Sequence, residues 1–165
     1  MKNKYWIIIG VIVILLIVVA VLLTRKDEDH KPVEVSKIKS FEFGYTVGYA
    51  MWSDVRYRMD CELDGCNVII KLNGVPEEEQ VEGVVGKEQS ARIEELLAKY
   101  NIGNWNGFNK SDKYVLDGDS FSFWIYMEDG KEIHASGYMM YPKNYREFKN
   151  EIDSFFDELK KIIEK

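Results

Sequence analysis

An uninterrupted apolar run near the N-terminus constrains this chain more than any other feature. All residues from Trp6 to Leu23 are uncharged, and all except Gly10 are apolar. A helix of this length spans about 27 Å, close to the hydrocarbon thickness of a bilayer. Tyr5 stands beside Trp6, where aromatic side chains meet the membrane interface. We therefore predict a transmembrane anchor over residues 5–24 and a location at the cell membrane.

A cleaved signal peptide is the alternative interpretation of this run. The apolar part of such a peptide normally has about 7–15 residues and ends at a small-x-small cleavage site. Val18 and Ala20 could form such a site, but the apolar residues continue past it to Leu23. No cysteine lies near residue 20 of the sequence, which excludes a lipid-modified N-terminus. We favour a retained, single-pass anchor.

Positive charges flank the run on both sides. Lys2 and Lys4 favour a tail, residues 1–4, that stays inside, whereas Arg25 and Lys26 favour the opposite orientation. Long domains cross membranes largely regardless of flanking charge. We expect the N-terminus inside and the domain outside the membrane.

The remaining 141 residues carry 20 basic and 28 acidic side chains, a formal charge of −8. Nucleic acids require clustered Lys and Arg side chains that displace counterions from the phosphates, so this acidic balance argues against a nucleic-acid partner. Residues 25–39 are rich in charge, contain Pro32 and show no apolar period, which predicts a short tether. One domain is then expected over residues 40–165.

Alternation of apolar and polar residues predicts strands in this domain. The first strand begins at Phe41, and the next two flank a four-residue turn that places Cys61 opposite Cys66. Shifting this register by one residue would mix apolar and charged side chains on both faces. A short strand is expected around residues 81–85.

A second hairpin is predicted over about residues 121–138. A three-residue loop that ends at Gly130, in the left-handed conformation, keeps the apolar residues on one face. Trp124 and His134 then form a pair on the other face. A two-residue loop would instead place Ile125 opposite His134.

Two segments have the apolar spacing of amphipathic helices. One covers about residues 87–100, and the other begins after Pro142 and continues for about six turns. Residues 104–118 between the helix and the second hairpin are expected to be irregular. We therefore predict an α+β fold: an N-terminal transmembrane helix followed by an antiparallel sheet of five or six strands, with two helices packed on one face.

Cys61 and Cys66 are the only two cysteines of the chain. Opposed strand residues have Cα atoms about 4.5–5.5 Å apart, within the range of a disulfide. We expect a disulfide if the domain lies in an oxidising compartment, and two buried thiols in a reducing one. A metal site would need further ligands, and His30 and His134 lie elsewhere, so we expect none.

No pattern in the sequence predicts a catalytic residue or a cofactor. His134 is the only histidine of the predicted domain and is expected to pack beside Trp124. Asp117 and Asp119 offer oxygen ligands for calcium, but they lack the pattern of an EF-hand loop, and a turn explains them equally well. The sequence contains neither a G-x-S-x-G motif nor a phosphate-binding Gly-rich loop.

Several aromatic side chains remain outside the predicted core and, with one histidine, form a candidate binding surface. Two helices cover only one face of a sheet, so some of these residues must lie on the open face or beneath the loop over 104–118. Exposed aromatic groups beside small residues suit a protein partner or a glycan, whereas a second core layer is the alternative. The members of this surface are Trp52, Trp105, Phe108, Trp124, Tyr126, His134 and Tyr141.

Four different short motifs lie within about residues 90–160. They are Trp105-Asn106-Gly107-Phe108, Val115-Leu116-Asp117-Gly118, Asp129-Gly130-Lys131 and Tyr141-Pro142. In these motifs the chain resembles uncharacterised small membrane-anchored or lipoprotein-type proteins of bacteria and archaea. The resemblance implies an extracytoplasmic domain of unknown function and carries over no catalytic residue.

These observations together predict a single-pass, membrane-anchored extracytoplasmic domain that binds a protein or another envelope component, including a glycan. One alternative is a membrane-proximal hydrolase-like enzyme that acts through acids around Asp117 and Asp119. Another is an inhibitor-like domain that blocks an envelope enzyme with its open sheet face. A deep pocket that gathers these acids or His134 would favour the enzyme, and a flat aromatic sheet face would favour binding.

Overall fold

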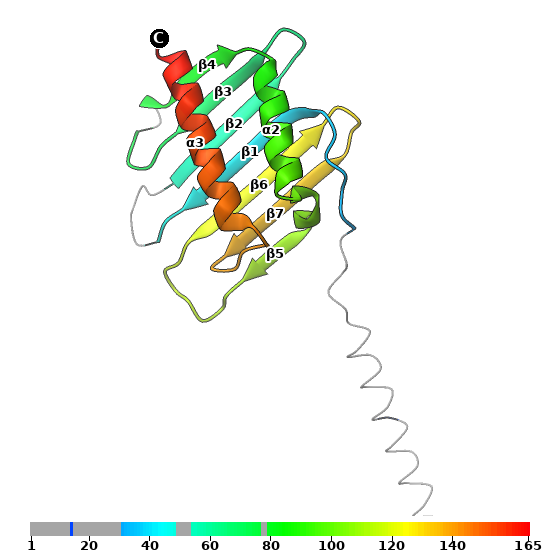
Figure 1. Cartoon of the computed structure of the whole chain (residues 1–165). Helices are drawn as coiled ribbons and strands as arrows, with labels where there is room; N and C mark the ends of the chain where they lie inside the picture. The colour runs from blue at the N-terminus through cyan, green and yellow to red at the C-terminus, as the bar shows by residue number, and fades with distance from the viewer. Residues whose placement is uncertain (1–13, 15–30, 49–53, 77–78) are drawn as a thin grey trace, which may run out of the picture. The chain divides into compact units, whose positions relative to one another are not determined.

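The computed structural model describes residues 14, 31–48, 54–76 and 79–165 (Figure 1). The predicted anchor over residues 5–24, apart from residue 14, and the candidate residue Trp52 lie outside these ranges. Within the ranges, the structure contains no helix that is long and apolar enough to cross a membrane. The chain forms two compact units, Met1–His30 and Lys31–Lys165, and every strand and helix labelled in Figure 1 belongs to the second.

In the residues that the structure describes, the second unit has the predicted α+β class, with one sheet and two α-helices. Its strands are β1 (Ile38–Thr46), β2 (Asp54–Cys61), β3 (Cys66–Lys71), β4 (Val81–Val85), β5 (Phe108–Ser111), β6 (Ser120–Met127) and β7 (Glu132–Tyr138). The helices are α2 (Glu88–Lys99) and α3 (Tyr145–Ile163), with a short 3-10 helix η2 (Ile102–Trp105). The seven strands follow the order β4-β3-β2-β1-β6-β7-β5, so β1 lies at the centre.

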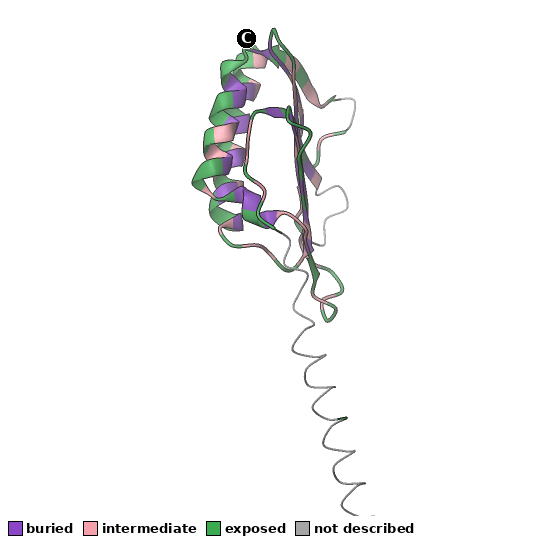
Figure 2. Cartoon of the chain, turned by 90° about the vertical axis from the view of Figure 1, so that its right-hand side faces the viewer, coloured by how far each residue is buried: buried purple, intermediate pink, exposed green. Residues whose placement is uncertain are grey.

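Both α-helices cover the same face of the sheet, as predicted (Figure 1). In the edge-on view of Figure 2, the buried residues lie between the helices and the strands. Phe148 and Phe156 of α3 pack against Phe43 and Phe41 of the central strand. Burying an apolar side chain of this size contributes about 1.5–3 kcal/mol. This aromatic layer is therefore the main attachment of α3 to the sheet.

The two hairpins have the predicted registers. Cys61 pairs with Cys66 at the end of β2 and β3, and the two residues form a disulfide. Trp124 pairs with His134 between β6 and β7. Gly130, which closes the second hairpin, has a φ of 81°, the left-handed conformation that a glycine adopts without strain. Both registers keep the buried apolar side chains on the helix-covered face.

The predicted strand number of five or six is wrong, because β5 adds a seventh strand. β5 lies at one edge of the sheet and pairs in parallel with β7, so the sheet is mixed and not purely antiparallel. Three of its four residues are exposed. A short, exposed strand has no alternation of apolar and polar residues, and residues 104–118 therefore looked irregular.

The compact unit begins earlier than the domain predicted over residues 40–165. The β1 strand begins at Ile38, which is buried, and backbone N–H groups at this residue and in the segment before it donate hydrogen bonds to the α2–η2 region. The Val33 N–H donates to the Gly103 carbonyl at 3.1 Å, and the Ile38 N–H donates to Glu94 Oε1 at 2.9 Å. Residues 31–39 of the expected tether therefore belong to the domain.

A Gly103→Ala substitution tests how this segment is held. A Cβ at position 103 would lie 1.9 Å from the Val33 carbonyl oxygen, so the segment must move away. We expect the free energy of unfolding to fall by about 1–3 kcal/mol, measured by urea denaturation of the full chain in detergent. We also expect faster proteolysis within residues 31–37.

Gly48→Ala is the matched control, because a Cβ at position 48 meets its nearest atom at 3.5 Å, an ordinary contact. Equal stability of the two variants would show that residues 31–37 do not depend on the close approach at Gly103.

Candidate functional site

The structure divides the predicted binding surface between the two faces of the sheet. Trp124, Tyr126 and His134 lie on the open face, because they alternate along β6 and β7 with buried residues. Trp105, Phe108 and Tyr141 lie on the helix-covered side, where they contact core residues. The open face therefore keeps three of the six candidate residues that the structure describes.

Trp105 shows why the other three belong to the core. Its side chain is 2% exposed, its ring packs 5.1 Å from that of Phe148, and its indole N–H donates to the Lys143 carbonyl at 3.1 Å. Tyr141 stacks on Tyr145 with ring centroids 4.6 Å apart. These rings belong to the core on the helix-covered side of the sheet, or pack against it, and form no second layer.

The strand registers arrange the open face in rows that run across the sheet. One row contains Lys71, Arg56, Gly44, Ser122, Ser136 and Asn109. The next row contains Ile69, Arg58, Glu42, Trp124 and His134. In both rows the charged residues lie over β1, β2 and β3, and the β6–β7 side carries aromatic and hydroxyl groups. The two halves of the face therefore differ in chemistry.

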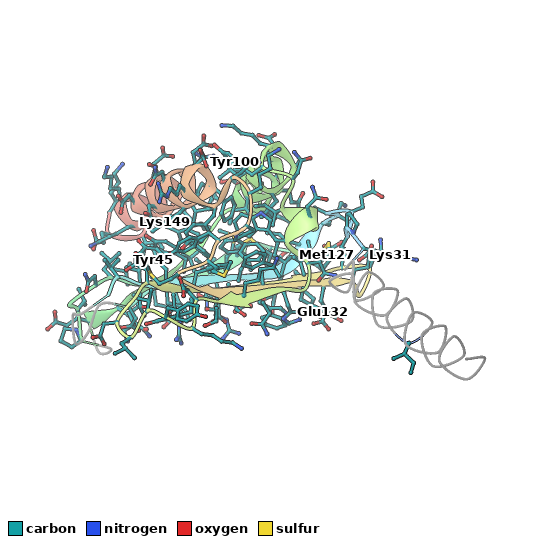
Figure 3. All side chains as sticks on the ribbon, turned by 90° about the horizontal axis from the view of Figure 1, so that it is seen from below. Lys31, Tyr45, Tyr100, Met127, Glu132 and Lys149 are labelled. Carbon is teal, nitrogen blue, oxygen red and sulfur yellow. A yellow bond between two sulfur atoms is a disulfide. The ribbon has the colours of Figure 1, made fainter. Side chains whose placement is uncertain are left out.

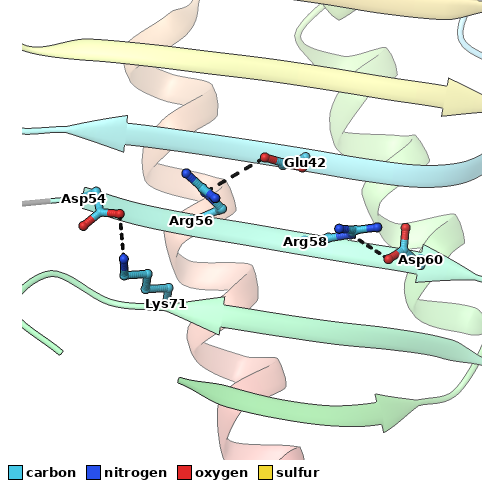
Figure 4. Close-up of polar contacts among 6 residues, drawn as sticks. All are labelled: Glu42, Asp54, Arg56, Arg58, Asp60 and Lys71. Atoms are coloured by element: carbon cyan, nitrogen blue, oxygen red, sulfur yellow. Dashed lines mark hydrogen bonds and ion pairs between the residues drawn. The ribbon is translucent and has the colours of Figure 1, made fainter. Parts of the chain in front are cut away.

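The charged half of the open face is paired within itself (Figure 4). The pairs are Arg58 Nε with Asp60 Oδ2 at 2.7 Å, Lys71 Nζ with Asp54 Oδ2 at 2.9 Å, and Arg56 Nε with Glu42 Oε1 at 4.0 Å. The hydrogen bond from Lys71 holds the pKa of Asp54 below its ordinary value. Exposed ion pairs of this kind contribute little to stability. They do leave these strands with balanced charge.

Two rings on the other half are held by one carboxylate. Trp124 and His134 stack with ring centroids 5.8 Å apart and an interplanar angle of 30°. The indole N–H donates to Glu132 Oε2 at 3.3 Å, and His134 Nε2 lies 2.5 Å from the same oxygen. The hydrogen bond with His134 holds the pKa of Glu132 below its ordinary value. We call Trp124 and His134 the ring pair.

The acids of the predicted hydrolase do not meet His134. Asp119 Oδ1 accepts a hydrogen bond from the Gly48 N–H at 2.7 Å, at the start of β6. Ser120, the next residue, pairs with Tyr138, which is four residues or about 13 Å along β7 from His134. In the described ranges, no three His, Cys, Asp or Glu side chains are grouped so that they could hold a metal ion.

A second polar cluster lies beneath α3 and was not predicted (Figure 3). Tyr45 and Tyr57 each donate a hydrogen bond to Asp153 Oδ1 at 3.0 Å. Lys149 Nζ donates to Asp153 Oδ2 at 2.7 Å and lies 3.8 Å from the centre of the Tyr45 ring. Burial raises the pKa of both tyrosines. All the donors therefore stay protonated at neutral pH, and the cluster fixes α3 to β1 and β2.

A hollow of about 330 Å³ lies between α2 and α3. Its charged side chains also pair with one another, Arg92 with Glu158 and Lys99 with Glu151. Glu151 also accepts a hydrogen bond from Tyr100, and these contacts lower its pKa. Because these partners hold the two helices together, we assign the hollow to helix packing and the candidate site to the open face.

Comparison of the chain with protein families, with curated proteins and with solved structures finds no match. The resemblance of residues 90–160 to membrane-anchored microbial domains stays a prediction, and function must be argued from the open face itself.

Asp153→Ala tests the cluster beneath α3. The substitution leaves two tyrosine hydroxyls and one ammonium group without their acceptor, so we expect the free energy of unfolding to fall by about 1–3 kcal/mol. Asp157→Ala is the matched control, since Asp157 is exposed on the same helix. Urea denaturation of the full chain measures both, and equal values would contradict a role for Asp153 in fixing α3.

The two tyrosines predict a loss of stability at alkaline pH. Their pKa values are higher in the folded than in the unfolded chain, where tyrosine titrates near 10.0. Their contribution is therefore complete below about pH 10 and is lost as the pH rises further. We expect the urea midpoint to fall continuously from about pH 10 upward, because the tyrosines then ionise in the unfolded chain while the two folded-state hydroxyls stay protonated.

The variant Tyr45→Phe/Tyr57→Phe should show a shallower fall over the same range. Some dependence will remain, because burial also raises the pKa of Tyr145. A fall as steep as that of the unmodified chain would exclude these two hydroxyls as its source.

Proposed function

We propose that this chain is a single-pass membrane protein whose domain lies outside the cytoplasm and binds an envelope component through the open face of its sheet. The observation that carries the proposal is the chemistry of that face. Both α-helices pack on the opposite side, while the β6–β7 half presents a fixed ring pair beside small hydroxyl residues. Surface rings held in place in advance lose little conformational entropy on binding.

Two features support the membrane and extracytoplasmic parts of the proposal. The apolar run from Trp6 to Leu23 has the length and composition of an anchor. The disulfide between Cys61 and Cys66 is typical of an oxidising compartment. The proposal places the bound component near the membrane, because only a short stretch of sequence separates this run from the domain.

Binding is favoured over hydrolysis by the separation of the acids from His134. General acid–base chemistry needs its groups within hydrogen-bond reach of one substrate. Asp119 directly precedes β6 and accepts a hydrogen bond from the Gly48 N–H, whereas His134 bonds Glu132 on β7, four residues from the Ser120 partner Tyr138. The described residues thus support a recognition surface.

The substitution Ser122→Arg tests this function. Ser122 is exposed in the row of small residues, and its Oγ would lie 3.3 Å from a Cβ at Gly44, so a long charged side chain there obstructs the face. The full chain in lipid nanodiscs would be mixed with delipidated envelope material from the native cells and pelleted. We expect the variant to be retained at least about tenfold less.

Asp157→Arg, on the exposed side of α3, is the control and should be retained like the unmodified chain. Equal retention of Ser122→Arg and the unmodified chain would refute binding through the open face. Digestion of intact cells by an external protease tests orientation separately, and complete protection of the domain would contradict its extracytoplasmic position.

A further inference from the structure

The two side chains of the ring pair are fixed by a shared hydrogen-bond acceptor and by stacking, although they lie on the surface of the sheet. The indole N–H and His134 Nε2 share Glu132 Oε2, and the rings stack at 5.8 Å. The side chains of His134 and Glu132 are nevertheless 59% and 47% exposed. Trp124 is partly buried, so solvent reaches the fixed ring pair most openly at His134.

The charge on the face indicates a neutral ligand. Arg56, Arg58 and Lys71 each have a carboxylate partner on the face. A phosphate-rich or polyanionic ligand would have to break these pairs, and a polycation would compete with the same basic side chains. Glu132 and Glu82 add two further carboxylates to this face, so it also repels anions, and an uncharged ligand avoids both costs.

The residues beside the ring pair favour a polyhydroxylated ligand over a protein. A stable protein interface buries about 800 Å² on each partner around an apolar core. Here the large aliphatic residues of the open face, Ile69 and Val84, lie on β3 and β4, away from the rings. The groups near the rings are instead hydroxyls and amides, which donate and accept hydrogen bonds as sugar hydroxyls do. They are Asn109, Ser122 and Ser136, in the row next to that of the rings.

We propose that the ring pair is a stacking platform for a neutral, β-linked polysaccharide of the envelope. A pyranose with equatorial substituents has a flat C–H face, which loses contact with water when it covers an aromatic ring. The hydroxyls at its edge would bond to the neighbouring serines and to Glu42, which pairs with Trp124 across β1 and β6. This inference rests on the proposed function and names the ligand of the same face.

Titration calorimetry of the full chain in lipid nanodiscs tests the inference. The probes are the hexasaccharides of β-1,4-linked N-acetylglucosamine and β-1,4-linked glucose, both neutral, and a sulfated hexasaccharide. We expect one or both neutral probes to bind, and binding of the sulfated probe to be at least about tenfold weaker. Trp124→Ala should reduce the affinity for a neutral probe by about tenfold or more, while Trp124→Phe should retain part of it.

Tyr114→Ala is the matched control, because Tyr114 is an aromatic residue that is 97% exposed on the loop before β6. It should bind as the unmodified chain does. Circular dichroism establishes whether each variant is folded. If Trp124→Ala does not fold, Trp124→Phe still tests the role of the indole. Preference for the sulfated probe, or unchanged affinity in a folded Trp124 variant, would overturn the platform.

The outcomes separate this inference from the function on which it rests. If neither neutral probe binds but Ser122→Arg still lowers envelope retention, the glycan is refuted and binding through the face stands. Loss of retention after protease treatment of the envelope material would identify a protein partner and would also refute the glycan. If Ser122→Arg has no effect, both proposals fail.

Discussion

The packing of α3 against the central strand is the contact on which the rest of the structure depends. Phe148 and Phe156 cover Phe43 and Phe41, and beside them Asp153 takes hydrogen bonds from two strand tyrosines. Apolar burial supplies most of the free energy, and the hydrogen bonds set the position of the helix, because a buried hydroxyl without a partner is costly. The core is thus concentrated on one side of the sheet.

This one-sided core explains the candidate site. In each strand, every second side chain points away from the helices, so the side chains on this open face must be compatible with water in the absence of a ligand. The strands β2 and β3 meet this condition with paired charges. The strands β6 and β7 meet it with small hydroxyl residues and with two rings whose polar atoms share Glu132. Only the arrangement on β6 and β7 leaves aromatic surface available to a ligand. The ring pair is therefore the feature of the open face that says most about its function.

The local sequence pattern was sufficient to predict the structure where segments that are neighbours in the chain pair with each other. The registers of both hairpins, the opposition of Cys61 and Cys66 and the two helices follow from alternation, turn residues and apolar spacing. It was insufficient for β5, whose partner is reached by a parallel crossover and whose residues are mostly exposed. It also misplaced Trp105, because a lone tryptophan in an irregular stretch carries no period that assigns it to a face.

The sequence by itself determined the apolar anchor candidate, the acidic domain, the α+β class and the face on which Trp124 and His134 lie, since these depend on composition and on residues close in the chain. Tertiary structure decided the seventh strand, the attachment of residues 31–37 and the cluster around Asp153. It also brought Glu132 to both rings of the pair. These contacts join elements or side chains whose meeting depends on the packed geometry of the chain, and no local period in the sequence records that geometry.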